Sequence, residues 1–324
     1  MSRLPFANEG SEGSEGSEGS EGSEGSEGSE GSEGSSVSGI GAYAGRRISP
    51  LLANALITNH GELTRSYWGG IPNPNTVPGA LTHIEAMNRW SRRVRAQLYT
   101  FELIKGLSFA TTNANATLSG PGWAGAVVVN PPYETAANLP GALQHVVDMA
   151  TLRSDRLAEI LTQINVPYSF FASLLNLQPG RHRHTYELMS TALILSGVAV
   201  MQFKHHFRVP RPADRSPLIQ PMIQTPNHGA YPAGHPCQGY ILSRVLQALV
   251  GNVVLGAELP TQLDRLADRV GENRVVAGVH YAADITAGAQ LGRDLAVRFL
   301  ALANTGNAPT TALEWLWAAA AAEW

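Results

Sequence analysis

The stretch KHHFRVPRP, residues 204–212, is the first of three short clusters that decide the fold of this chain. The second cluster is YPAGH, residues 231–235, and the third is NRVVAGVHYAAD, residues 273–284. Each cluster combines a cationic side chain or a histidine with a residue that starts, stops or bends a helix. None of the three would be decisive alone, but in this order they predict one cationic, histidine-lined site for an oxyanion.

The first cluster places two cations near the end of a helix. Lys204 follows an apolar helical pattern, and Pro210 and Pro212 hold the chain around Arg211 in an extended turn. Arginine offers a planar fork that binds a tetrahedral oxyanion through two hydrogen bonds, whereas lysine acts as a point charge. Surface salt bridges would explain this cluster if it stood alone.

The second cluster precedes a helical pattern. Backbone N–H groups and the positive end of the helix dipole at such a helix start favour an anion, and Gly234 allows close approach of the backbone. His235 can donate or accept a proton near neutral pH. His228, seven residues upstream of His235, lines the same pocket or is simply exposed.

The third cluster supplies one more cation and a histidine–carboxylate pair. Arg274 is the cation, and the i, i+4 spacing of His280 and Asp284 places both side chains on one face of a helix. A carboxylate that accepts the Nδ1 proton leaves Nε2 free to attack phosphorus or to coordinate a metal oxyanion. A helix-stabilising ion pair is the alternative for this pair taken singly.

Outside the clusters, apolar residues recur at helical spacing over most of the chain. The predicted helices are residues 82–106, 141–164, 185–207, 234–250, 261–270, 284–304 and a C-terminal helix from about residue 310. The one plausible strand is AGAVVVN, residues 124–130. Arg92, Arg93 and Arg95 lie off the apolar stripe of their helix and are expected to face solvent. The sequence therefore predicts an all-α fold, a large helical bundle.

Eight Ser-Glu-Gly repeats fill residues 11–34 and hold no apolar side chain, so they cannot belong to a core. Residues 1–38 are predicted to be a disordered tail or linker, and the repeats fit a natural tract as well as an engineered one. Residues 39–324 are expected to form a single α-helical, oxyanion-binding catalytic domain.

Charge and cysteine content point to no macromolecular partner. The formal net charge of -3 includes the eight glutamates of the repeats, so the remaining domain is slightly basic, and neither nucleic acid nor membrane is an expected partner. Cys237 is the only cysteine, which excludes an intrachain disulfide.

The expected location is cytoplasmic. The longest uncharged apolar run, residues 188–203, is 16 residues long, whereas a membrane-spanning helix needs roughly 20. The start, MSRLPFANEG, has no apolar region of the kind found in a secretory signal. The sequence leaves a homo-oligomer open.

The ordered motifs Lys-x6-Arg-Pro, Pro-Ser-Gly-His and Arg-x5-His-x3-Asp are the signature of a superfamily that joins type 2 phosphatidic acid phosphatases, bacterial class A acid phosphatases and vanadium-dependent haloperoxidases. This chain resembles a member of its soluble, haloperoxidase-like branch. The resemblance implies a helical bundle of the acid phosphatase/vanadium-dependent haloperoxidase type. Ala233 stands where the motif has serine, and Asn273 stands where a serine usually precedes the motif arginine.

The resemblance also implies roles for the residues that match the motifs. It implies that Lys204, Arg211 and Arg274 hold the oxygens of vanadate or phosphate, that Gly234 donates its backbone N–H, and that His235 is the acid/base residue. It implies further that His280, backed by Asp284, is the vanadium ligand, or the nucleophile of a phosphatase. The position of His228 resembles that of a second histidine in algal bromoperoxidases.

The function implied first is that of a vanadium-dependent haloperoxidase, which uses vanadate and hydrogen peroxide to oxidise a halide, bromide more than chloride, and then a small organic substrate. One alternative is a phosphomonoesterase that acts on a phosphate ester through a phosphohistidine at His280 and needs no vanadate. Another is a non-catalytic protein that binds an oxyanion.

Overall fold

The computed structural model describes residues 80–112, 115–131, 137–164, 168–256 and 258–324, together with four helical positions between residues 51 and 58. All described residues belong to one compact unit, Ser49–Trp324. The Ser-Glu-Gly tract and the predicted boundary after residue 38 lie outside the described residues.

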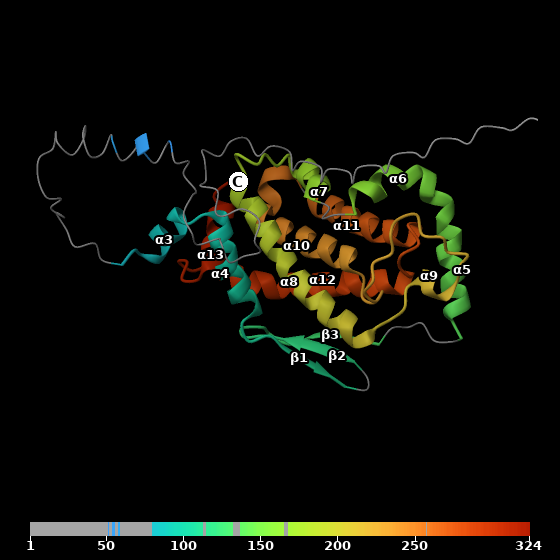
Figure 1. Cartoon of the computed structure of the whole chain (residues 1–324). Helices are drawn as coiled ribbons and strands as arrows, with labels where there is room; N and C mark the ends of the chain where they lie inside the picture. Colours follow the sequence, from blue (N-terminus) through green and yellow to red (C-terminus); the bar gives the residue numbers. More distant parts are fainter. Residues whose placement is uncertain are drawn as a thin grey trace, which may run out of the picture. The chain divides into compact units, whose positions relative to one another are not determined.

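The described part of the chain is mostly helical (Figure 1), which confirms the predicted all-α class. The helices are α3 (His83–Arg89), α4 (Arg92–Ile104), α5 (Leu139–Met149), the 3-10 turn η3 (Ala150–Leu152), α6 (Arg153–Thr162), α7 (Tyr168–Leu175), α8 (Arg183–Phe207), α9 (Pro212–Arg215), α10 (Gly234–Leu255), α11 (Leu259–Val276), α12 (Ala282–Ala303) and α13 (Ala312–Ala321).

Helix α10 packs against α8, α11 and α12, and these four helices hold most of the core. Glycines let α12 approach α10 closely, since a Cβ atom on Gly288 would lie 2.2 Å from the carbonyl oxygen of Ala233. A Cβ atom on Gly292 would lie 2.4 Å from the carbonyl oxygen of Cys237. The N–H of Ala233 donates to the carbonyl of Asp284 over 3.0 Å, so this close packing joins the second and third sequence clusters.

A small antiparallel sheet lies beside the bundle, in the order β1-β2-β3. Its strands are β1 (Ser108–Thr111), β2 (Ala116–Ser119) and β3 (Val127–Val129), and it packs on α8 and α12. Strand β3 confirms the strand predicted within residues 124–130. Strands β1 and β2 were not predicted, because four-residue segments of small and polar side chains carry too little alternation to be told from a loop.

Two predictions between residues 82 and 106 were wrong. The single predicted helix is broken into α3 and α4, since Trp90 is extended and the hydroxyl of Ser91 accepts the N–H of Val94 as the cap of α4. Arg95 does not face solvent: it is 8% exposed and donates from Nε and Nη2 to the carboxylate of Glu187 on α8 over 2.9 and 2.7 Å.

Helix α11 continues beyond the predicted end at residue 270 to Val276, so Asn273 and Arg274 lie in its last turn. Helix α8 ends as predicted at Phe207, with Lys204 in its last turn. Lys204 and Arg274 therefore both lie in the last turn of a helix and not in a loop.

Within the described residues, one helical stretch, Arg183–Arg215, is long and apolar enough to cross a membrane, and 61% of its apolar window is buried. It consists mainly of α8, which packs against α4, α10, α12 and α13. These contacts are those of a helix inside a bundle, and the cytoplasmic location stays a prediction.

Candidate oxyanion-binding site

The predicted site residues converge from the ends of four helices and from the turns between them. Lys204 lies in the last turn of α8, Arg211 is the N-cap of α9, Gly234 is the first residue of α10 and Arg274 lies in the last turn of α11. The charged members of the set, together with His280, are each at most 4% exposed: Lys204, Arg211, Arg274, His280 and Asp284. Burial of three cations with one carboxylate is costly unless an anion joins them.

His280 is held with one nitrogen on a carboxylate and the other facing a cation. Its Nδ1 lies 2.9 Å from Asp284 Oδ2 and its Nε2 lies 2.9 Å from Arg211 Nη1. Because a carboxylate accepts and a guanidinium donates, Nδ1 carries the proton and Nε2 presents its lone pair. Burial, followed by the charge of Arg211, holds the pKa of His280 well below 6.5. The imidazole is therefore neutral, and its Nε2 lone pair accepts from Arg211 Nη1.

The pairing of His280 with Asp284 does not arise as predicted. His280 lies two residues before α12, and Tyr281 is the N-cap of that helix. Asp284, in the first turn, accepts from the N–H of Tyr281 over 3.0 Å as well as from His280. A capping carboxylate, rather than a shared helical face, brings the two side chains together.

Arg211 joins the first and third clusters and also brings in His228. Its Nη1 donates to the carbonyl of Val279 over 2.8 Å and its Nε to the carbonyl of His228 over 3.1 Å. Its Nη2 lies 3.1 Å from His228 Nδ1. The His228 residue is exposed, so this histidine lies at the outer edge of the site.

Lys204 is tied to the loop that precedes the second cluster. Its Nζ donates to the carbonyls of Gly229 and Ala230, each over 2.7 Å. Burial, followed by repulsion from Arg211, lowers the pKa of Lys204 from 10.5 to about 7. An anion bound nearby would favour the charged form of this lysine.

His235 and Arg274 share one neighbour that the sequence did not indicate, Gln163, the C-cap of α6. His235 Nε2 lies 2.7 Å from the carbonyl oxygen of Gln163, and Arg274 Nη2 donates to the side-chain Oε1 of Gln163 over 3.1 Å. A glutamine near the end of an amphipathic helix carries no sequence signal for a site. Contact with Arg274 and His235 is its only distinguishing feature.

Buried N–H groups of Arg274 point to an anion. Among the described residues, Arg274 Nε and Nη1 are buried and have no hydrogen-bond partner. Burial also lowers the pKa of Arg274 and of Arg211 from 12.5 to about 10, yet both stay charged at neutral pH. Unpaired guanidinium N–H groups beside a histidine lone pair form a donor set that suits a tetrahedral oxyanion.

The protonation of His235 predicts a pH dependence of stability. Burial, followed by the charge of Arg274, lowers its pKa from 6.5 to about 4. Between these pH values the unfolded chain binds more protons at this residue, so the free energy of unfolding falls as the pH falls. At about 1.4 kcal/mol per pKa unit, the difference between 6.5 and about 4 contributes at most about 3.5 kcal/mol.

Urea unfolding between about pH 7 and pH 4, in buffer without phosphate, measures this effect. The His235→Gln variant should lose less stability over that range than the wild type. The buried imidazole of His280 contributes in the same direction and remains in the variant. Equal pH dependence in the two proteins would contradict the assignment.

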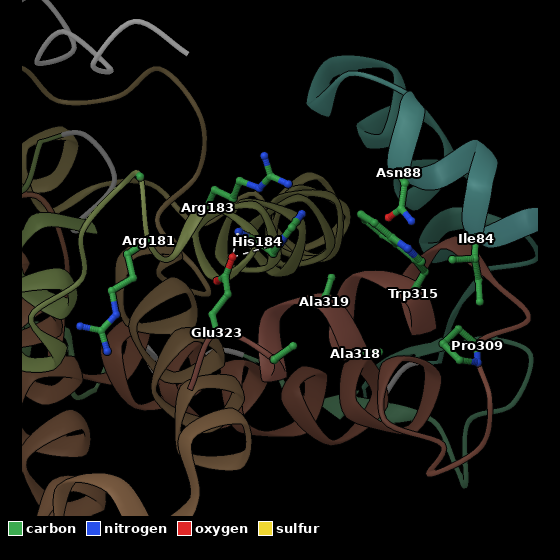
Figure 2. A pocket seen from close by; sticks show the side chains of 12 residues that line it. Ile84, Asn88, Arg181, Arg183, His184, Pro309, Trp315, Ala318, Ala319 and Glu323 are labelled. Atoms are coloured by element: carbon green, nitrogen blue, oxygen red, sulfur yellow. Dashed lines mark hydrogen bonds and ion pairs between the residues drawn. The ribbon is translucent and has the colours of Figure 1, made fainter. Parts of the chain in front are cut away.

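Three surface hollows of about 530, 240 and 460 Å³ lie within the described residues, and none of them is lined by the predicted site residues. Figure 2 shows the hollow of about 530 Å³, where His184 and Glu323 face each other. Glu323 accepts from the N–H groups of His184 and Thr185 over 2.7 and 2.8 Å. It therefore caps the start of α8, and its role there is structural.

This sequence matches no protein-family model and no curated protein. The structure is similar to that of a bacterial vanadium-dependent iodoperoxidase, with 20% sequence identity and a TM-score of 0.41, over 52% of this chain and 50% of that chain. It is also similar to a transmembrane PAP2-type phosphatidylglycerolphosphate phosphatase from Bacillus subtilis, with 20% identity and a TM-score of 0.39, over 51% of this chain and 85% of that chain. The match thus spans about half of the iodoperoxidase, and scores this low do not by themselves assign a family.

Proposed function

We propose that this protein is an enzyme that binds vanadate at the Lys204–Asp284 site and uses it with hydrogen peroxide to oxidise a halide, bromide more than chloride. The observation that carries the proposal is the neutral His280, whose Nε2 lone pair faces Arg211 while Asp284 accepts from Nδ1. A lone pair oriented in this way suits a bond to an electrophilic atom such as vanadium or phosphorus. The three buried cations beside it suit the negative oxygens that such an atom carries.

The residues present fit vanadate. His280 Nε2 would bind the vanadium, and Lys204, Arg211, Arg274 and the N–H of Gly234 would hold its oxygens. The unpaired Nε and Nη1 of Arg274 are free to take part. When bound, vanadate supplies a Lewis-acidic centre that activates peroxide towards a halide.

The histidines of the chain provide the proton chemistry. With a pKa lowered to about 4, His235 is neutral near pH 7; its Nε2 donates to the carbonyl of Gln163, so it would accept a proton from peroxide at Nδ1. His228 contacts Arg211 at the outer edge of the site, where it would meet the halide and the organic substrate. A neutral His235 suits a base better than the general acid that a phosphatase needs near neutral pH.

A phosphomonoesterase is the second candidate, because the same Nε2 lone pair would serve as a nucleophile towards phosphorus. In that case His280 forms the phosphohistidine, and His235 acts as the acid only at low pH or once a bound anion has raised its pKa. Vanadate would then be an inhibitor rather than a cofactor.

Activity with and without vanadate separates the candidates. Protein stripped with a chelator should not brominate phenol red with peroxide and bromide, and should do so after reconstitution with about one orthovanadate per chain. Hydrolysis of p-nitrophenyl phosphate by the vanadate-free protein, without bromination after reconstitution, would contradict the haloperoxidase and favour the phosphatase. If the protein binds orthovanadate but turns over neither substrate, the remaining interpretation is a non-catalytic protein that binds an oxyanion.

A further inference from the structure

Gln163 lies against the candidate site in a fully buried position, with 0% of its surface exposed. It caps the C-terminal end of α6, where its N–H donates to the carbonyl of Glu159 over 2.9 Å. Its own carbonyl lies 2.7 Å from His235 Nε2. Both backbone contacts fix the residue before its side chain is considered.

The side-chain amide of Gln163 has one defined orientation. Its Oε1 accepts from Asn273 Nδ2 over 2.9 Å and from Arg274 Nη2 over 3.1 Å. A guanidinium donates only, so the atom facing Arg274 must be the oxygen and the amide cannot be flipped. The NH₂ group of Gln163 is thereby directed away from Arg274 Nη2.

That NH₂ group has no hydrogen-bond partner within the part of the chain that the structure describes. The same holds for Nε and Nη1 of Arg274, so three buried donor atoms without partners belong to two residues in direct contact. Leaving a buried donor unpaired costs about 1–3 kcal/mol. Two residues in contact that both hold unpaired buried donors favour a ligand that accepts hydrogen bonds from both.

We propose that Gln163 is a binding residue of this site and that its Nε2 donates to the oxyanion that Arg274 holds. The proposal rests on the proposed function, since it assigns a further donor to the same anion. Ala233, just before α10, has no hydroxyl that could donate to the anion. One neutral donor from Gln163 offsets the absence of one neutral donor there.

Two substitutions separate a donor from a residue that only positions Arg274. Gln163→Met removes donor and acceptor at similar volume. Gln163→Glu keeps the acceptor for Asn273 and Arg274 but replaces the NH₂ group by a negative oxygen. Gln262→Met, on an exposed position of α11, is the matched control.

The probes are orthovanadate and inorganic phosphate, and the dissociation constant is measured by isothermal titration calorimetry. Loss of one hydrogen bond to a charged group, at about 1.5–3 kcal/mol, should weaken binding to Gln163→Met by roughly 10-fold or more. Gln163→Glu should bind still more weakly, because its carboxylate repels the anion. Gln262→Met should bind like the wild type.

Each other outcome overturns the proposal. Wild-type affinity in a folded Gln163→Met protein shows that the amide makes no contact with the anion. Wild-type affinity in Gln163→Glu, with loss in Gln163→Met, shows that Gln163 acts only by holding Arg274. If the wild type binds neither probe, the oxyanion site itself fails, and the proposed function with it.

A measurement on the wild type tests the same hydrogen bond without any substitution. It therefore remains valid if a variant does not fold, and it is free of the charge repulsion that Gln163→Glu introduces. The Nε2 protons of Gln163 are observed by ¹⁵N NMR in selectively labelled protein, with the signal assigned through bonds. Saturation with phosphate should move these proton resonances downfield and slow their exchange with water. Resonances that do not change on saturation contradict the proposed hydrogen bond.

Discussion

The His280→Ala variant of the proposed haloperoxidase should lose halide oxidation by more than about a thousandfold while remaining folded, because His280 would bond to the reacting centre and no other residue could replace it. In the phosphatase alternative the same variant lacks the nucleophile, and its rate of phosphate-ester hydrolysis should fall by an equal or larger factor. His280 is the one histidine of the described chain that contacts both Asp284 and Arg211, so no neighbour can take over its position.

The loss should appear in kcat more than in the binding of the oxyanion. Lys204, Arg211 and Arg274 remain in the variant and still attract an anion, so orthovanadate should bind, although more weakly. His205→Ala, at an exposed position in the last turn of α8, is the control and should keep full activity. Activity within about tenfold of the wild type in a folded His280→Ala protein would remove His280 from the mechanism.

The Glu187→Ala variant should lose about 3–5 kcal/mol of stability, since removing one partner of a buried ion pair leaves the other charge uncompensated. Arg95 is bound through two nitrogens to Glu187, whose Oε1 also accepts from the hydroxyl of Tyr99 over 3.0 Å. The guanidinium of Arg95 lies 5.0 Å from the ring centre of Trp315. This contact set joins α4, α8 and α13.

Urea unfolding of the wild type and three variants measures the effect. Glu187→Gln keeps the shape and part of the hydrogen bonding and should fall between the wild type and Glu187→Ala. Asp148→Ala removes an exposed carboxylate that accepts from Gln144 over 2.8 Å and should change the free energy of unfolding by less than about 0.5 kcal/mol. A loss below about 1 kcal/mol in Glu187→Ala would mean that Arg95 finds water or another partner.

The motif residues of the site could be predicted from the sequence because each lies at the start or end of a helix, where prolines, glycines and the end of an apolar pattern mark the chain. The charges of Lys204, Arg211, Arg274 and His235 act on His280 in the structure, while the roles assigned to these residues stay predictions. What the spacing did not predict is how His280 meets Asp284, since an i, i+4 pair fits a helical face as well as an N-cap.

Residues defined by a distant partner could not be predicted. Arg95 pairs with Glu187, 92 residues later in the chain. From the sequence alone, an arginine off the apolar stripe of its helix is predicted to face solvent. Gln163 meets Arg274 across 111 residues, and nothing in the pattern of its own helix marks it. Such contacts depend on how the helices pack against one another, and this packing cannot be predicted from the apolar pattern of a single sequence.

If the three buried cations and His280 form one oxyanion site, a crystal soaked in orthovanadate should hold vanadium there. Anomalous scattering locates the vanadium. We expect one vanadium per chain, bonded to His280 Nε2, with its oxygens within hydrogen-bond distance of Arg211 and Arg274. Vanadium bound elsewhere, or none at His280 in a crystal that diffracts well after soaking, would contradict it.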